Sequence, residues 1–235
     1  MKARFKLSTL NEKKESPFGR IIILTGARQT GKTTLAKLCF SDFQYLSIED
    51  PVQRGNYTKL TASQWKLFYP KAILDEVQKE PVLIESIKAV YDQYNDTRYL
   101  LLGSSQFLLL QKVKESLAGR CLIEEIYPLT LPELLTKTSS ETIEKSEFQK
   151  YLSTGIWPET LSNFQLYPDF ANRLHVFDYY LKFGGYPALT AQNISNEDRN
   201  DWLKNYVRTY LERDVRDLAE FRNLEPFVKT QRVSS

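Results

Sequence analysis

The sequence has few of the side chains that carry most hydrolytic and metal chemistry: its 235 residues include one histidine and two cysteines. The single histidine, His175, lies in an amphipathic stretch, so histidine-dependent hydrolysis and zinc binding lack the groups they need. Cys39 and Cys121 do not have the spacing of metal ligands. Two such cysteines suit a reducing cytoplasm better than a disulfide scaffold.

The chain also lacks a strong excess of charge and any long apolar run. Its 32 basic and 29 acidic side chains leave a net charge of +3, too small by itself to indicate nucleic-acid binding. No stretch approaches the roughly 20 apolar residues of a membrane span. The basic N-terminus is not followed by the apolar core of a signal peptide. We therefore expect a soluble, cytoplasmic protein with an ordinary core.

One glycine-containing segment stands out from this composition. The apolar residues 21–24 lead directly into the pattern G-x-x-x-x-G-K-T, which opens into a helix-forming sequence. Strand, loop and helix in that order are the context that supports a phosphate-binding loop. We therefore assign nucleotide binding to Gly26, Ala27, Arg28, Gln29, Thr30, Gly31, Lys32, Thr33 and Thr34.

The residue types in this loop suit a nucleoside triphosphate. Gly26 and Gly31 allow backbone conformations that side chains disfavour, so successive N–H groups can turn toward a phosphate. The helix that begins near Lys32 adds its unpaired N–H groups and the positive end of its dipole. The Lys32 ammonium suits the β- and γ-phosphates, and the Thr33 hydroxyl suits a Mg²⁺ ion.

Two acids, Asp75 and Glu76, end the next strongly apolar run, which begins at residue 71. Carboxylates at the carboxyl end of a parallel strand lie at the edge where open α/β sheets bind ligands. We predict that Asp75 holds Mg²⁺, usually through a water, and that Glu76 polarises the water that attacks the γ-phosphate. A base for water favours a hydrolase over a small-molecule kinase. The alternative is a solvated pair of acids at a strand end.

Two serines follow another apolar run, residues 99–102. Either Ser104 or Ser105 could hydrogen-bond the γ-phosphate or the attacking water, and the spacing does not choose between them. The alternative is that they cap the following helix.

Arginines complete the predicted catalytic set. A suitably placed arginine raises nucleotide hydrolysis about 10³–10⁵-fold. Arg120 is the first candidate for such an arginine finger, and Arg28 in the loop is the second. The alternative for Arg120 is a surface ion pair with Glu124 or Glu125.

The chain resembles the predicted AAA+-like ATPases of bacteria and archaea, in which a P-loop domain precedes a conserved domain of unknown function. The resemblance covers most of the chain and rests on LTGARQTGKTTL, AILDEVQ, LLGSSQFLLL, LAGR, FGGYPAL and YLERDVRDL. It implies ATP and Mg²⁺ at the loop, an acid pair at 75 and 76, and a sensor serine. It implies no substrate. Family members usually continue beyond residue 227 into a winged-helix-like segment and a further domain, so we expect a C-terminally truncated product.

Strands and helices alternate after residue 18, which predicts an α/β fold: the parallel sheet of a P-loop NTPase, flanked by helices. The expected strands are Arg20–Leu24, Gln44–Ile48, Lys71–Asp75, Tyr99–Leu102 and Cys121–Glu125. The expected helices are Lys32–Phe40, Pro81–Tyr94 and Gln106–Lys114. The resemblance implies that the strand before the serines lies between the loop strand and the acid strand.

We expect two parts: an AAA-like ATPase domain over residues 1–135 and a mainly helical region over 136–235. Residues 1 to about 18 are polar, and residues 11–17 predict a loop before the first strand. Pro51 predicts a plain turn after the second strand. Gly184 and Gly185 predict a helix stop. Apolar residues at helical spacing over 201–218 predict one buried helix face, and Ser195 opens a capping box before it.

These features predict a Mg²⁺-dependent ATPase that couples its nucleotide state to the helical region. The chain has no N-K-x-D guanine-reading motif, and the resemblance favours ATP. The alternative is a nucleotide-gated module with slow hydrolysis that binds DNA or a protein partner through its C-terminal part. An oligomer is compatible with the sequence, which leaves open whether Arg120 acts in its own subunit or in a neighbouring one.

Overall fold

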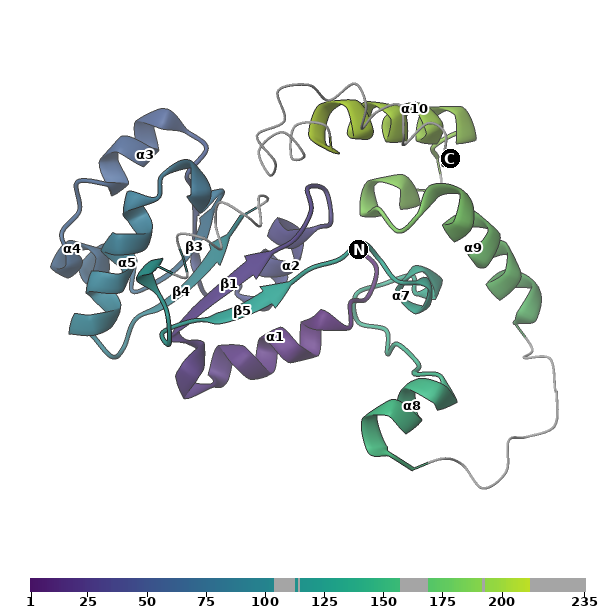
Figure 1. Cartoon of the computed structure of the whole chain (residues 1–235), viewed down its shortest axis with the longest axis horizontal. Helices are drawn as coiled ribbons and strands as arrows, with labels where there is room; N and C mark the ends of the chain where they lie inside the picture. Colours follow the sequence, from purple (N-terminus) through teal and green to yellow (C-terminus); the bar gives the residue numbers. More distant parts are fainter. Residues whose placement is uncertain (104–112, 114, 157–168, 192, 212–235) are drawn as a thin grey trace.

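The computed structural model describes residues 1–103, 113, 115–156, 169–191 and 193–211. A five-stranded parallel sheet with helices on both faces forms the first part of the chain (Figure 1). Helices from the later part lie to one side of this sheet. The predicted α/β class, a parallel sheet followed by a helical region, is confirmed.

All five predicted strands are present, and their ends differ from the prediction by at most one residue. They are β1 (Ile21–Thr25), β2 (Gln44–Ser47), β3 (Lys71–Asp75), β4 (Arg98–Leu102) and β5 (Leu122–Glu125). Their order in the sheet is β2-β3-β4-β1-β5, and every pair is parallel. The strand before the serines, β4, therefore lies between the loop strand and the acid strand, as the resemblance implied.

The helices around the sheet are α1 (Lys6–Glu15), η1 (Pro17–Arg20), α2 (Lys32–Cys39), α3 (Pro51–Tyr57), α4 (Ala62–Phe68), η2 (Val77–Lys79), α5 (Val82–Gln93) and α7 (Leu131–Leu135). The later helices are α8 (Glu147–Thr154), α9 (Phe170–Phe183), η3 (Pro187–Thr190), α10 (Asn196–Tyr206) and the π-helical η4 (Val207–Leu211). The predicted helices over 32–40 and 81–94 are confirmed as α2 and α5. The one predicted over 106–114 falls almost wholly outside the described residues.

The core has two layers because β1 is buried on both faces. Ile21 and Ile23 pack with the layer that contains Trp65 of α4 and the buried residues of α5. Ile22 and Leu24 belong to the other layer, which includes Leu10 of α1 and residues of α2. A continuous apolar run is what a parallel strand covered on both faces requires.

The predicted loop before the first strand is wrong, because residues 6–15 form helix α1. Leu10 is fully buried against the α2 side of the sheet. Lys6 and Lys13 form ion pairs with the buried carboxylate of Glu124. The helix is therefore stabilised by packing and charge contacts with distant parts of the chain, which its own polar composition does not reveal.

The predicted plain turn at Pro51 is also wrong, because Pro51 is the first residue of α3. The Asp50 carboxylate accepts a hydrogen bond of 2.9 Å from the Val52 N–H and caps the helix. Proline is tolerated there because the first N–H groups of a helix have no intrahelical acceptor. Helix α4 follows from a capping box between Thr61 and Gln64.

The two glycines after α9 end that helix, as predicted, and also fix it to the sheet domain. Gly184 adopts φ 70° at the end of α9. The Gly185 oxygen accepts a hydrogen bond of 2.6 Å from the Leu129 N–H. A Cβ on Gly185 would lie 1.9 Å from the Leu129 oxygen, so only glycine allows this contact.

Helix α10 begins as predicted, because the Ser195 hydroxyl accepts a hydrogen bond from the Asp198 N–H. No residue of α10 is buried, so the predicted buried face is wrong for residues 201–206. Its aromatic side chains instead form a half-buried cluster with Tyr186. None of the helices within the described residues has the length and apolar character needed to cross a membrane.

Candidate nucleotide site

The loop between β1 and α2 has the backbone conformations that its glycines predicted. Gly31 adopts φ 88° immediately before α2, and Gln29 is a non-glycine residue at φ 62°. A Cβ on Gly26 would lie 2.1 Å from the Ile126 oxygen, so the segment after β5 allows no side chain at this position. The loop therefore curls tightly and directs the first N–H groups of α2 toward its interior.

Lys32 lies inside the curve of this loop. Its ammonium donates hydrogen bonds of 2.8 and 2.7 Å to the backbone oxygens of Gly26 and Ala27. The residue is only 7% exposed. The positive charge is thus held within the ring of backbone groups, where a phosphate chain would meet it.

Thr33 and Asp75 bring two oxygen donors together at the carboxyl edge of the sheet. The Thr33 hydroxyl, at the start of α2, donates a hydrogen bond of 2.8 Å to Oδ2 of Asp75 at the end of β3. Oδ1 of Asp75 accepts from the Glu76 N–H at 3.0 Å. Among the described residues, no group of three or more His, Cys, Asp and Glu side chains could hold a metal ion. The Thr33 hydroxyl and the Asp75 carboxylate are oxygen donors of the kind that Mg²⁺ prefers, since this ion binds to one or two protein oxygens plus phosphate oxygens and waters.

Glu76 lies next to this pair in an unusual backbone conformation, φ 59° and ψ 38°. The Gln78 side-chain amide donates a hydrogen bond to its carboxylate. A non-glycine residue in the left-handed region costs free energy and is held there by its surroundings. The sequence analysis did not predict this role of Gln78. Its position two residues after Glu76 was the signal that could have identified it.

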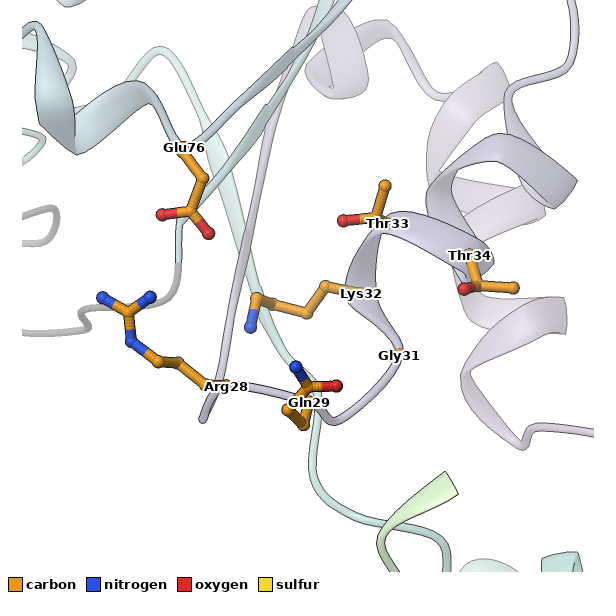
Figure 2. Close-up of a pocket in the computed structure, with 7 residues that line it drawn as sticks. All are labelled: Arg28, Gln29, Gly31, Lys32, Thr33, Thr34 and Glu76. Carbon is orange, nitrogen blue, oxygen red and sulfur yellow. The ribbon is translucent and has the colours of Figure 1, made fainter. Parts of the chain in front are cut away.

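Most of the predicted nucleotide-binding residues line one cavity of about 270 Å³ (Figure 2). Its lining residues are Arg28, Gln29, Gly31, Lys32, Thr33, Thr34 and Glu76. Figure 2 shows Lys32 between the loop and Glu76, with the Arg28 guanidinium on the same side as Glu76. The fold thus gathers the loop and the acid pair at one edge. The predicted sensors Ser104 and Ser105 lie outside the described residues.

Arg120 is not at this cavity. It precedes β5 at the amino edge of the sheet, whereas the loop follows the carboxyl end of the parallel neighbour β1. Its Nε donates a hydrogen bond of 2.8 Å to Asp92 at the end of α5. Within one chain Arg120 therefore does not reach the loop, and the alternative pairing with Glu124 or Glu125 is wrong because the partner is Asp92. Donation to a neighbouring subunit stays a prediction.

A second cavity, of about 210 Å³, adjoins the first. The two cavities share Gly31 and Thr34. The other lining residues of the second are Met1, Lys2, Arg4, Thr30, Leu129, Pro187 and Thr190. Sequence reasoning missed this cavity because its walls come from the N-terminus, the loop, the segment after β5 and η3, and no local pattern joins them.

The helical region touches the loop directly. The Tyr206 hydroxyl, at the end of α10, donates a hydrogen bond of 3.2 Å to the Arg28 backbone oxygen. The Tyr206 ring stacks on Trp202 with centroids 5.2 Å apart and lies 4.8 Å from the Tyr186 ring. One aromatic cluster therefore connects α10, the turn after α9 and the phosphate loop.

A phosphate loop after β1, a buried lysine within it and an acid two strands away define a P-loop ATPase domain. Residues 19–135 match the family model described as "AAA domain". Residues 174–233 match the model described as "Domain of unknown function (DUF8612)". The chain therefore contains an AAA-type P-loop ATPase domain, followed by a domain of that second family.

Relatives with similar sequences occur in bacteria and archaea. The chain is 29% identical over 204 residues to the uncharacterized protein Rv2008c of Mycobacterium tuberculosis, which covers 85% of this chain and 37% of the relative. It is 26% identical over 224 residues to the uncharacterized protein MJ1544 of Methanocaldococcus jannaschii, which covers 88% of this chain and 44% of the relative. The chain thus spans less than half the length of these relatives.

A solved structure shares the fold. The Walker-type ATPase PABY2304 of Pyrococcus abyssi superimposes with a TM-score of 0.54 at 13% identity, over 94% of this chain and 76% of that chain. At this identity the likeness establishes the fold, which confirms the predicted P-loop NTPase class.

Proposed function

We propose that the protein binds ATP together with Mg²⁺ and hydrolyses it. The observation that carries this proposal is the contact between Thr33 and Asp75, 2.8 Å, beside the buried ammonium of Lys32. Lys32 and the loop N–H groups bind the phosphates. Thr33 and Asp75 hold the magnesium ion, which when bound neutralises phosphate charge.

Glu76 acts as the base in this proposal. Its carboxylate lines the same cavity as Lys32 and Thr33, and Gln78 fixes its orientation. The carboxylate would accept a proton from the attacking water as the water oxygen bonds to the γ-phosphorus. The bond from that phosphorus to the bridging oxygen would break, and ADP and phosphate would leave. The family resemblance implies that Ser104 or Ser105 is the sensor, and we retain that role in this proposal. Arg28, the second candidate for the arginine finger, lines the cavity and takes that role within one chain.

The second cavity supports a binding place for the base and sugar of ATP. It continues from the phosphate site across Gly31 and Thr34. Met1, Leu129 and Pro187 give it apolar walls, which suit the faces of a purine ring. The absence of a guanine-reading motif from the sequence favours adenine.

This placement also supports coupling between the bound nucleotide and the helical region. We place the ATPase domain at residues 1–135 and the helical region at residues 136–235. Pro187 and Thr190 of η3 line the second cavity, and Tyr206 bonds to the loop that lines the first. A nucleotide that occupies both cavities would contact the two parts of the chain at once. Bound ATP and its hydrolysis products would make different contacts with the two parts, and this difference would shift the conformation of the helical region.

Steady-state phosphate release tests the proposed activity. The wild-type protein should hydrolyse ATP only with Mg²⁺ present, and faster than GTP. A Glu76→Gln variant should bind ATP and release phosphate at least about 10²-fold more slowly. Equal rates for wild type and variant would exclude Glu76 as the base.

A second candidate function is a nucleotide-gated binding module with slow hydrolysis. Four exposed apolar side chains on α9 favour a protein partner over DNA, because they recur at helical spacing on one face. They are Phe170, Leu174, Phe177 and Leu181. Phosphate release measured with and without DNA, over a range of salt concentrations, tests whether DNA or a protein is the partner. No effect of DNA and no salt-dependent binding would exclude DNA as the partner.

A further inference from the structure

Tyr45 lies on the edge strand β2, outside the motifs that define the nucleotide site. Its hydroxyl donates a hydrogen bond of 2.8 Å to Oδ2 of Asp75. The same oxygen accepts the hydrogen bond of Thr33, also at 2.8 Å. Asp75 is only 7% exposed, so these donors, together with the Glu76 N–H on Oδ1, surround a buried carboxylate.

The parallel register of the two strands explains how Tyr45 reaches this position. Tyr45 lies opposite Ile73 of β3, and Asp75 follows two residues later on the same face. Two residues of a parallel strand span about 6.6 Å, close to the length of a tyrosine side chain that leans along its strand. The strand register therefore places the Tyr45 hydroxyl beside the Asp75 carboxylate.

The contacts of the ring keep Tyr45 in place as a donor. The Lys37 ammonium of α2 lies 3.6 Å from the centre of the ring, a cation–π contact. Tyr45 is 37% exposed, so loss of its oxygen leaves no large buried cavity.

We infer that Tyr45 is a positioning residue for the carboxylate that holds the magnesium ion; this inference rests on the proposed function. The two donors on Oδ2, together with the Glu76 N–H on Oδ1, fix the rotation of the Asp75 carboxylate. When phenylalanine replaces Tyr45, the Thr33 hydroxyl remains as the donor on Oδ2, and the carboxylate is held less firmly against rotation. Such partners of metal ligands typically contribute 10–100-fold to metal affinity or activity.

Binding measurements with a fluorescent, non-hydrolysable ATP analogue test this role. In the wild type, Mg²⁺ should strengthen binding relative to excess EDTA. Tyr45→Phe should lower the affinity measured with Mg²⁺ about tenfold and leave the affinity in EDTA unchanged. Electron paramagnetic resonance of Mn²⁺, titrated in the presence of the analogue, should show the same loss of metal affinity. Circular dichroism verifies that the variant is folded.

Tyr91→Phe is the matched control, because its ring also lies against a cation, the Arg20 guanidinium at 3.9 Å, but outside the nucleotide site. It should behave as the wild type. In an Asp75→Asn background, Tyr45→Phe should have no further effect, since it acts through Asp75. Wild-type metal affinity in Tyr45→Phe, or an equal loss in EDTA, would overturn the inference while the ATPase proposal stands. A wild-type protein that binds no nucleotide would overturn both.

Discussion

The Tyr206 hydroxyl of the helical region donates a hydrogen bond of 3.2 Å to the backbone oxygen of Arg28 in the phosphate loop. This is a contact between residues 178 positions apart in sequence. The accepting backbone oxygen belongs to the loop for which we propose phosphate binding. We propose that the helical region responds to the state of the loop through this one aromatic side chain.

Tyr206→Phe should reduce this response. A net hydrogen bond contributes about 1 kcal/mol, so ATP affinity should change by about fivefold. The change in Trp202 fluorescence on ATP addition should largely disappear, because Trp202 stacks on Tyr206. A Trp202→Phe variant shows how much of the fluorescence change comes from Trp202. Tyr94→Phe is the control. An unchanged fluorescence response in Tyr206→Phe would contradict the coupling.

Gln78→Ala should slow hydrolysis without weakening ATP binding. The Gln78 amide bonds to the Glu76 carboxylate, so its loss leaves the base less well oriented. We expect a fall in kcat of about tenfold, smaller than that of Glu76→Gln, with KM nearly constant. Glu80→Gln, in the same segment, is the control. A fall in affinity with unchanged kcat would instead place Gln78 in binding.

Thr190→Trp should separate the base site from the phosphate site. Thr190 lines only the second cavity, and a large side chain there would fill it. ATP affinity should fall by about tenfold or more, while the affinity for inorganic triphosphate should stay within about twofold. Isothermal calorimetry with both ligands measures the difference. Equal losses for ATP and triphosphate would argue against a base in this cavity.

Arg120→Ala should leave hydrolysis unchanged in monomeric protein, because the side chain pairs with Asp92 at the opposite edge of the sheet. Sedimentation at the assay concentration establishes whether the protein is monomeric. In an assembled form, mixing Arg120→Ala with Lys32→Ala subunits should restore activity only if the arginine acts across an interface. Loss of activity in the monomeric variant would contradict the observed position of Arg120.

The sequence predicted the sheet and the phosphate loop because both depend on local patterns. Apolar runs defined the five strands to within one residue, and the spacing of Gly26, Gly31 and Lys32 defined the loop. Helix α1 was missed because its stability comes from Leu10 and from the ion pairs with Glu124, far away in sequence.

The site was predicted in part for the same reason. Lys32, Thr33, Asp75 and Glu76 lie in two local motifs, and the fold gathers them. Tyr45 and the second cavity depend on strand register and on contacts between distant segments, which no local pattern encodes. The subunit in which Arg120 acts was left open, because a short sequence pattern does not show at which edge of the sheet a residue lies.

The most direct test of the central claim is calorimetric titration of the protein with ATP and Mg²⁺. The wild type should release or absorb heat that saturates at one nucleotide per chain. Lys32→Ala should bind at least about 10²-fold more weakly, and Lys88→Ala on α5 should match the wild type. Absence of any binding heat and of any bound nucleotide in the wild type, or full affinity in Lys32→Ala, would contradict the account.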